Sequence, residues 1–288
     1  GLQDLRVEAR LMRFIDGGKR PGESSLFPSH PVSDVSSRSS RMLQGDDINV
    51  NITAPGALIA LGLIFIRSNN ADILLRLAIP STAVALDSVW SDILLYRALA
   101  SCLVKWDSLE PSLDWMRSQI PDVILRPVFP STSTGTGMPP ASSKDPKLLY
   151  QSGRQLSPRV ALSHYLCAVT GYCFGTGLVF AGTSDIKAKT VILSHLKHGI
   201  CHIIAYPLHP LLFCHSFREG KPSIKFSFPV DKVLRSTIEM CVCSTALALS
   251  IVMAGSGDLD SLRILRELRW KVEEVMYGTH MALSMGIG

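Results

Sequence analysis

One pattern of small, apolar and polar positions recurs along the chain. Its clearest copy spans residues 171–185 and carries an apolar triplet at 178–180. The same layout returns 73 residues later, at 244–258, and it also occurs 115 residues earlier, at 56–70. A fourth copy begins at the C-terminus. The small positions of the four copies are Gly56, Ala60, Gly62, Gly171, Gly175, Gly177, Gly182, Ser244, Ala248, Ser250, Gly255, Gly286 and Gly288.

The spacing of these small positions predicts helices that are packed closely on two sides. In a helix, residues four apart lie about 40° apart around the axis, and residues two apart lie about 200° apart. Gly171 and Gly175 therefore share one face, while Gly177 points roughly the opposite way. A glycine inside a helix costs about 1 kcal/mol relative to alanine. Its recurrence indicates that neighbouring helices approach from both sides.

Each copy ends at a polar residue that suits the start of a second helix. Asn70, Asp185 and Asp258 occupy one aligned position, and Asn and Asp are favoured N-caps. The segment after Asp258 is amphipathic, with Arg263, Arg266, Glu273 and Glu274 lying off its apolar stripe. We expect the stripe to consist of Leu259, Leu262, Leu265, Leu268, Val272 and Met276. The repeating unit is thus one buried helix, a tight turn and one half-exposed helix.

The offsets are about one, two and three times a unit of roughly 36–38 residues, a period typical of repeat arrays. The sequence therefore predicts an all-α fold, an α-α superhelix or toroid of tandem helical hairpins. The alternative is a set of unrelated core helices in a globular protein. The shared N-cap position favours the repeat array.

The repeats divide the chain into five segments. Residues 1–18 are interpreted as the end of a preceding repeat, with a helix at 5–15. Residues 46–125 and 157–288 hold the repeats, and the last is cut short. Two flexible inserts, at 19–45 and 126–156, are rich in polar residues, and their serines are candidates for phosphorylation.

Within these segments we expect several local features. The alternation of Ile48, Val50 and Ile52 predicts an extended stretch over 46–53. A degenerate repeat copy places Ser101 at the position of Gly62, 39 residues further on. A short strand is expected within 205–230, where prolines exclude long helices. Because the chain begins with Gly1, it is expected to be a fragment of a longer protein.

Composition narrows the class of protein. Hydrophobic residues make up 47% of the chain, charged residues only 18%, and the mean hydropathy is +0.24. A membrane-spanning helix needs roughly 18 consecutive apolar residues, and the apolar runs at 54–66 and 241–254 are shorter, so no membrane partner is expected. The net charge of +5 is scattered, which argues against nucleic-acid binding. Seven cysteines in mostly apolar segments indicate reduced thiols in an intracellular protein.

The candidate chemistry is sparse. Gly175, Gly177 and Gly182 superficially resemble a dinucleotide-binding loop, but the third glycine comes too late for that motif. A zinc site could use His195, His198, Cys201 and His202, with Cys214 and His215 nearby; the alternative is a polar helix face that leads into a loop. Because no hydrolase, metalloprotease or kinase motif is present, we expect no enzyme activity and no cofactor.

The glycine-rich helix that ends in small residues resembles the proteasome/cyclosome repeat. This repeat occurs in two large non-ATPase subunits of the proteasome regulatory particle and in the largest subunit, subunit 1, of the anaphase-promoting complex. Several stretches favour the anaphase-promoting complex family, and they are Gly45–Ala57, Leu94–Ala100, Trp106–Pro111, Ser118–Pro121, Met253–Leu259 and Tyr277-Gly278. The resemblance covers most of 45–125, 160–200 and 235–288. It departs at Ser250, where the family commonly has glycine, and in the segments 19–44, 126–156 and 205–230.

The resemblance implies a non-catalytic scaffold in a multisubunit ubiquitin ligase that controls mitosis and cell division. It implies as neighbours the Doc-domain subunit, the cullin and RING module, and the coactivator region. It also implies a location in the nucleus and cytoplasm. The alternative is a proteasome regulatory-particle scaffold subunit, which shares the repeat but not the strings at 46–56 and 106–107.

Overall fold

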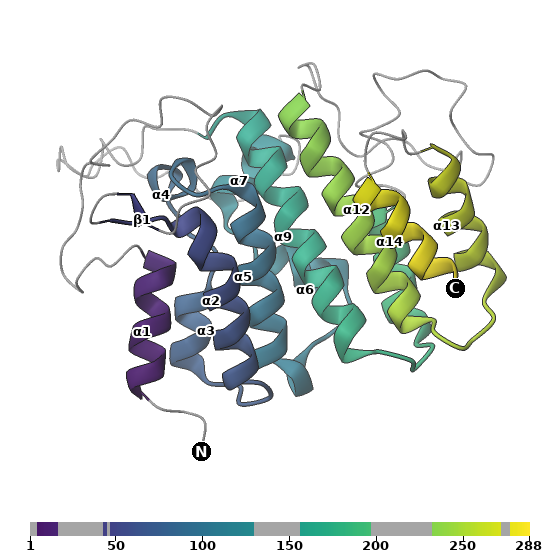
Figure 1. The fold of residues 1–288 in the computed structure, drawn as a ribbon, viewed down its shortest axis with the longest axis horizontal. Helices are drawn as coiled ribbons and strands as arrows, with labels where there is room; N and C mark the ends of the chain where they lie inside the picture. Colours follow the sequence, from purple (N-terminus) through teal and green to yellow (C-terminus); the bar gives the residue numbers. More distant parts are fainter. Residues whose placement is uncertain (1–4, 17–42, 45–46, 130–155, 197–231, 272–276) are drawn as a thin grey trace, which may run out of the picture.

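A computed structural model describes residues 5–16, 43–44, 47–129, 156–196, 232–271 and 277–288. One set of helices lies side by side in chain order, each against the next (Figure 1). These inner helices are α1 (Leu5–Asp16), α2 (Val50–Ile64), α5 (Ser91–Val104), α9 (Pro158–Val179), α12 (Lys232–Val252) and α14 (Tyr277–Ile287). The layer is therefore a one-dimensional stack.

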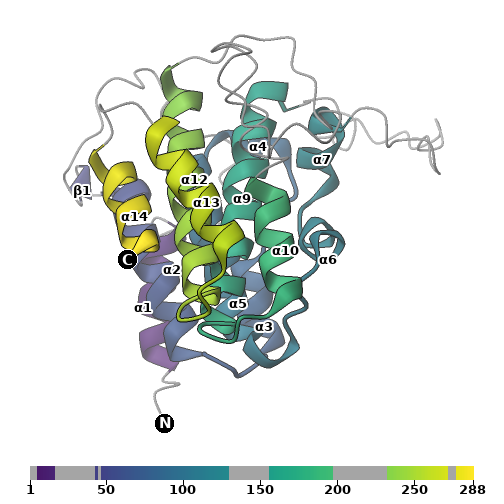
Figure 2. The same ribbon diagram turned by 90° about the vertical axis from the view of Figure 1, so that its right-hand side faces the viewer.

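The outer helices form a second layer, and most pack against the inner helix that comes next in the chain. They are α3 (Ala71–Leu77), α6 (Leu113–Ser118), α7 (Asp122–Val128), α10 (Ile186–Ser194) and α13 (Leu259–Lys271). Figure 2 shows α10 and α13 next to each other on one side of this stack. Each outer helix thus bridges two neighbouring repeats, which confirms the predicted all-α helical repeat fold.

The remaining elements are short. They are α4 (Ala83–Asp87), the 3-10 turn η1 (Trp106–Ser108), and the antiparallel strands β1 (Leu43–Gln44) and β2 (Asp47–Ile48). The sequence did not predict α4, which has the Thr82 hydroxyl as its N-cap. Two residues per strand make only a minor exception to a helical fold.

The core follows the stack. Helix α9 lies between α5 and α12 and is buried nearly all round, with Leu162, Leu166 and Val169 fully inaccessible. A separate apolar cluster surrounds α2, and it contains Leu58, Leu61, Ile73, Leu77, Ala100 and Val104. Apolar burial thus accumulates between neighbouring helices, as expected for helices hydrophobic on several faces.

The extended stretch predicted over 46–53 is wrong beyond residue 48. Helix α2 begins at Val50, and the carbonyl of Asn49 already accepts bonds from the amides of Ile52 and Thr53. Three alternating apolar residues are too few to distinguish a strand from a helix start. Burial of Ala54 in the helix decides the outcome.

The structure also corrects the start of the second predicted insert and the predicted apolar stripe of α13. Helix α7 continues to Val128, which is buried, so residues 126–128 do not belong to an insert. In α13 the buried stripe runs through Ile264, Leu265 and Leu268, whereas Leu259 is 65% exposed. Most of the two predicted inserts, at 19–45 and 126–156, and the strand expected within 205–230 lie outside the described residues.

Candidate functional site: the seam between repeats

Small residues bring neighbouring inner helices into close backbone contact. A Cβ added at Gly62 would lie 3.0 Å from the Cα of Ala100 in α5. A Cβ added at Gly177 would lie 2.9 Å from the Cα of Ala248 in α12. Real Cβ atoms do not sit this close to backbone atoms of another helix without a shift. We call this line of contacts the repeat seam.

Helix α9 makes such contacts on both sides. Towards α5, a Cβ at Gly171 would strike the carbonyl oxygen of Leu95 and lie 2.8 Å from the Cβ of Ala98. A Cβ at Gly175 would lie 2.6 Å from the Sγ of Cys102. Since Gly177 faces α12, the glycines of α9 divide between opposite faces, in keeping with helical geometry.

The contacts follow one rule along the stack. Helices α2, α5, α9 and α12 each carry two small residues separated by one, and the second residue of each pair faces a small residue of the next inner helix. Thus Gly62 faces Ala100, Cys102 faces Gly175, Gly177 faces Ala248, and Ser250 faces Gly286.

This rule corrects the expected alignment of the degenerate copy. Its small pair is Ala100 and Cys102, so the equivalent of Gly62 is Cys102 rather than Ser101. The helix ends agree, since the C-caps Phe65 and Lys105 are also shifted by one residue from the expected offset of 39. One extra residue between the two helices accounts for the shift.

Four of the predicted small positions, Gly56, Gly182, Gly255 and Gly288, make no such close contact with a neighbouring inner helix. Gly56 is exposed, and a Cβ there would meet no atom within 4 Å. A Cβ at Gly288 would approach only the Ser284 carbonyl oxygen of its own helix, at 3.8 Å. Ala60 and Ser244 are partly buried. Gly182 and Gly255 lie in turns instead, with positive φ angles of 66° and 75°.

The turns that follow α2 and α9 hydrogen bond to the end of the next inner helix. The amides of Arg67 and Asn69 donate to the carbonyls of Leu103 and Val104, at 3.0 and 3.1 Å. In the same way, Gly182 and Ser184 donate to Ile251 and Val252, at 2.9 and 3.0 Å. The donor residues have positive φ. The last carbonyls of a helix lack partners within it, so each turn supplies partners for its neighbour.

Three turns share the same two features, a hydrogen-bonded Ser or Thr hydroxyl and an Asn or Asp helix N-cap. Ser68, Thr183 and Ser256 each donate a hydroxyl back to the C-cap carbonyl, at 2.7–2.8 Å. Each hydroxyl also accepts the amide of the residue two further on, at 3.3 Å. That residue is Asn70, Asp185 or Asp258, and its side chain accepts amide bonds from the next helix. The predicted N-caps are therefore confirmed.

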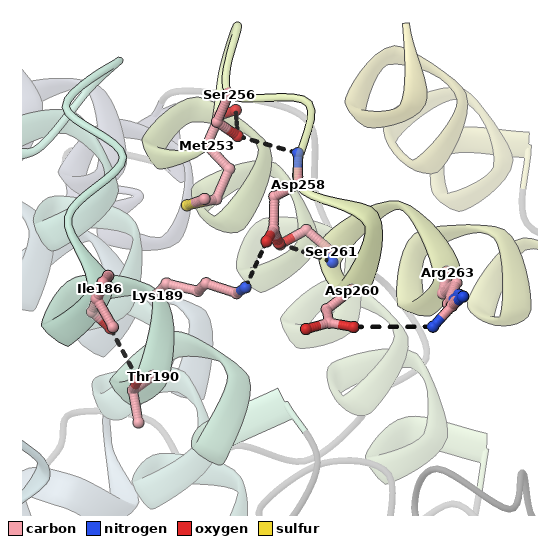
Figure 3. Close-up of polar contacts among 9 residues, drawn as sticks. All are labelled: Ile186, Lys189, Thr190, Met253, Ser256, Asp258, Asp260, Ser261 and Arg263. Carbon is pink, nitrogen blue, oxygen red and sulfur yellow. Dashed lines mark hydrogen bonds and ion pairs between the residues drawn. The ribbon is translucent and has the colours of Figure 1, made fainter.

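Ion pairs cross the seam beside these turns. Lys189 of α10 donates to the carboxylate of Asp258 at 2.7 Å, joining two outer helices (Figure 3). Hydrogen bonds from Lys189 and Ser261 lower the pKa of Asp258 from 3.8 to about 2. Arg67 pairs with Asp107 through two bonds of 2.8 and 3.2 Å. Both pairs link one repeat to the next.

The metal site considered from the sequence finds no support among the described residues. His195 is fully enclosed, its Nε2 lies 3.2 Å from the Thr170 hydroxyl, and burial lowers its pKa to about 3. Its proposed co-ligands His198, Cys201 and His202, together with Cys214 and His215, lie outside the described residues. Within the described part of the chain, no three His, Cys, Asp or Glu side chains gather to hold a metal.

The described cysteines are free thiols, and four of them are buried: Cys102, Cys167, Cys173 and Cys241. Burial raises the pKa of Cys102 to about 12.

One helix of the described chain, α12, is long and apolar enough to cross a membrane. It is packed between α9 and α14, and a core helix passes the same length test.

Comparison with known proteins points to a single family. A family model described as APC1 fifth domain matches residues 1–288. Anaphase-promoting complex subunit 1 of Dictyostelium discoideum is 32% identical over 87% of the chain and 11% of its own length. The Arabidopsis thaliana protein of the same name is 32% identical over 97% of the chain and 15% of its own length.

The chain belongs to the anaphase-promoting complex subunit 1 family. Another relative, the Emericella nidulans "Negative regulator of mitosis", is 30% identical over 81% of the chain and 9% of its own length. The chain thus spans less than a sixth of the length of these curated relatives. The proteasome alternative is not supported.

The structure shows where two of the sequence strings that resemble the subunit 1 family lie. Trp106 and Asp107 form η1, where Asp107 holds Arg67 of the preceding repeat. The string from Met253 to Leu259 forms the turn between α12 and α13. These strings therefore lie at the edge of the repeat seam. Sequence reasoning missed the partners of this edge, Arg67 and Lys189, because each pairs with a residue in another repeat.

Proposed function

We propose that the chain is a non-catalytic scaffold segment of the anaphase-promoting complex, in which the repeat array holds neighbouring subunits in fixed positions. The observation that carries this proposal is the repeat seam. Backbones in contact at Gly171 and Gly177, with turns bonded to the next helix, leave the described stack little freedom to bend. Stiffness of this kind suits a part that positions other proteins.

The same proposal names the neighbours and the location. The resemblance of the repeats supports contact with the Doc-domain subunit, the cullin and RING module, and the coactivator region, in the nucleus and cytoplasm. Ubiquitin transfer would then be performed by other subunits. The outer layer of a repeat array presents a long surface for such contacts.

The test uses the full-length subunit, tagged and expressed in cells. Gly171→Ala should lower recovery of the other complex subunits at least twofold, because the added Cβ strikes the Leu95 carbonyl. The matched control is Gly56→Ala, whose Cβ meets nothing within 4 Å and should leave recovery unchanged. Subunits are quantified by mass spectrometry after purification.

Cross-linking of the native complex distinguishes loss of subunit contacts from simple misfolding of the variant. We expect cross-links from lysines of this segment, such as Lys187, to the named neighbours. If every cross-link from this segment stayed within its own chain, the scaffold proposal would fail even if Gly171→Ala disrupted the protein.

A further inference from the structure

The outer face of α13 separates charge from apolar surface. Ile264, Leu265 and Leu268 are buried against the stack. Opposite them, Arg263, Arg266 and Arg269 are all exposed. At 100° per residue the three arginines fall within an arc of about 120°. We call this arc the arginine face.

Among the described residues of α13, the acidic side chains lie beside the arginine face rather than within it. Asp260 and Glu267 lie on its flank, between the arginines and the buried stripe, at about 80–100° from Leu259. Asp260 approaches Arg263 only at 4.0 Å, and both side chains are more than 70% exposed. A contact of that length between solvated groups is weak, so Arg263 stays available.

An exposed apolar residue completes the surface. Leu259, at the first turn of α13, is 65% exposed and lies within the same arc. An exposed apolar residue beside exposed arginines suits a protein contact, because arginine is enriched in such interfaces and their centre is more apolar than the rim.

From this arrangement we propose that the arginine face of α13 binds an acidic segment of a partner protein. Arginine binds carboxylates in a bidentate manner, and the arginines span about 9 Å along the helix. An extended peptide rises about 3.3 Å per residue, so a run of three to five residues rich in Asp and Glu covers the face. The inference deepens the scaffold proposal, on which it rests, by naming a docking surface and its ligand chemistry.

Nucleic acid fits this surface less well. A duplex presents one charge per about 1.7 Å and is held by many basic residues at once. Near α13, Asp258 and Asp260 lie at the end from which that helix starts (Figure 3), and Asp185 caps the same end of α10. Their carboxylates would repel a continuous phosphate backbone, whereas a short acidic segment avoids them.

The test places a photo-cross-linking amino acid at Leu259 of the full-length subunit within the assembled complex. After irradiation, the attached peptide is identified by mass spectrometry. We expect a protein segment rich in Asp and Glu. Changing Arg263, Arg266 and Arg269 together to Glu should lower the cross-link yield about tenfold. The three Arg→Lys changes should lower it less, because lysine keeps the positive charge but loses the bidentate geometry.

A matched control changes the same number of exposed positive charges elsewhere. Arg10→Glu, Arg13→Glu and Lys187→Glu together should leave the yield at Leu259 unchanged. Raising the salt from about 0.05 to 0.5 M should lower the wild-type yield, since exposed charge pairs are screened. The single change Arg266→Glu gives a second reading if the triple variant unfolds.

Several outcomes would overturn the inference. They are a cross-linked peptide poor in acidic residues, a cross-link to nucleic acid or lipid, a yield unaffected by charge reversal, or no cross-link to another chain. Each can occur while the complex still assembles around the wild-type subunit. Failure of the docking surface is therefore distinguishable from failure of the scaffold proposal, which shows as unchanged subunit recovery in Gly171→Ala.

Discussion

At the scale of single residues, the repeat seam depends on side chains that are nearly absent. Gly177 and Ala248 allow two helix backbones to touch, and dispersion attraction between these backbones takes the place of the larger side chains of an ordinary core. Gly56 has the same residue type in the same kind of helix, but it faces solvent. The two glycines should therefore respond oppositely to the same substitution.

Gly177→Ala should destabilise the chain by about 1–3 kcal/mol, because its methyl group meets the Ala248 backbone. Gly56→Ala should stabilise it by about 0.5–1 kcal/mol, because alanine favours the helix and meets no neighbour. Denaturant unfolding of the two variants against the wild type measures both effects. Equal effects at the two positions would contradict the seam.

Through Asp258, the stability of the folded chain depends on pH. Its pKa is lowered from 3.8 to about 2 in the folded chain, first by the hydrogen bond from Lys189. The unfolded chain therefore takes up the proton first as the pH falls. The stabilisation is complete above about pH 4 and is lost as the pH falls towards 2.

Lys189→Met should therefore cost about 1 kcal/mol at neutral pH, and the cost should shrink below about pH 4. Unfolding curves measured between pH 3 and 7 follow the difference from the wild type. In an Asp258→Asn background, the lysine change should have little effect at any of these pH values. A cost that stayed constant with pH would show that the lysine acts by packing alone.

At the scale of elements, the turn after an inner helix is the most regular part of the repeat. In three copies it has the same length, the same hydroxyl bond and the same cap, at Asn70, Asp185 and Asp258. In the turns after α2 and α9, two backbone positions with positive φ aim their amides at the end of the adjacent helix. Local backbone geometry thus connects elements that are distant in sequence.

Gly182→Ala tests this geometry without any steric clash. A Cβ at Gly182 meets nothing within 4 Å, but its φ of 66° is unfavourable for alanine. We expect a loss of about 1–2 kcal/mol in unfolding free energy. The wild-type chain and Gly56→Ala serve as references, and a loss below about 0.3 kcal/mol would contradict the strained turn.

The elements also show what sequence reasoning could reach. The helix caps and small positions were predictable because each is decided by residues a few positions apart. The pair Ala100 and Cys102 could not be predicted in this way, because its alignment depends on which residues of α2 and α9 it contacts. Helix α4 and the start of α2 at Val50 were missed for a similar reason: short segments take their conformation from burial rather than from their own pattern.

The arginine face was likewise hidden in the sequence. The apolar pattern places Arg263 and Arg266 off a stripe that was expected to include Leu259. The structure rotates the buried stripe towards Ile264 and leaves Leu259 beside the arginines. The rotation follows from the packing of α13 against α12 and α14, which a helical wheel alone does not specify.

At the scale of the whole molecule, the described stack has a centre and two ends. Helix α9 is flanked by α5 and α12, whereas α1 and α14 each have one inner neighbour among the described helices. In repeat arrays, stability is roughly a sum of repeat and interface contributions. Helices at the ends therefore open more readily than those in the middle.

Hydrogen exchange of the 288-residue chain should show this gradient. Amides of α9 should exchange most slowly, those of α5 and α12 next, and those of α1 and α14 fastest. Mass spectrometry of peptic peptides at neutral pH resolves these helices. Equal protection of α9 and α14 would contradict stepwise coupling along the stack.

The two edges of the array differ in what they tolerate. Three turns that connect an inner helix to its outer helix, at 65–70, 180–185 and 253–258, are each six residues long. Their residues form hydrogen bonds with fixed partners, so an added residue would break these bonds. In sequence, the long segments at 17–42, 130–155 and 197–231 each come before an inner helix, α2, α9 or α12. The three six-residue connections within hairpins thus keep one length, whereas these connections between hairpins differ in length.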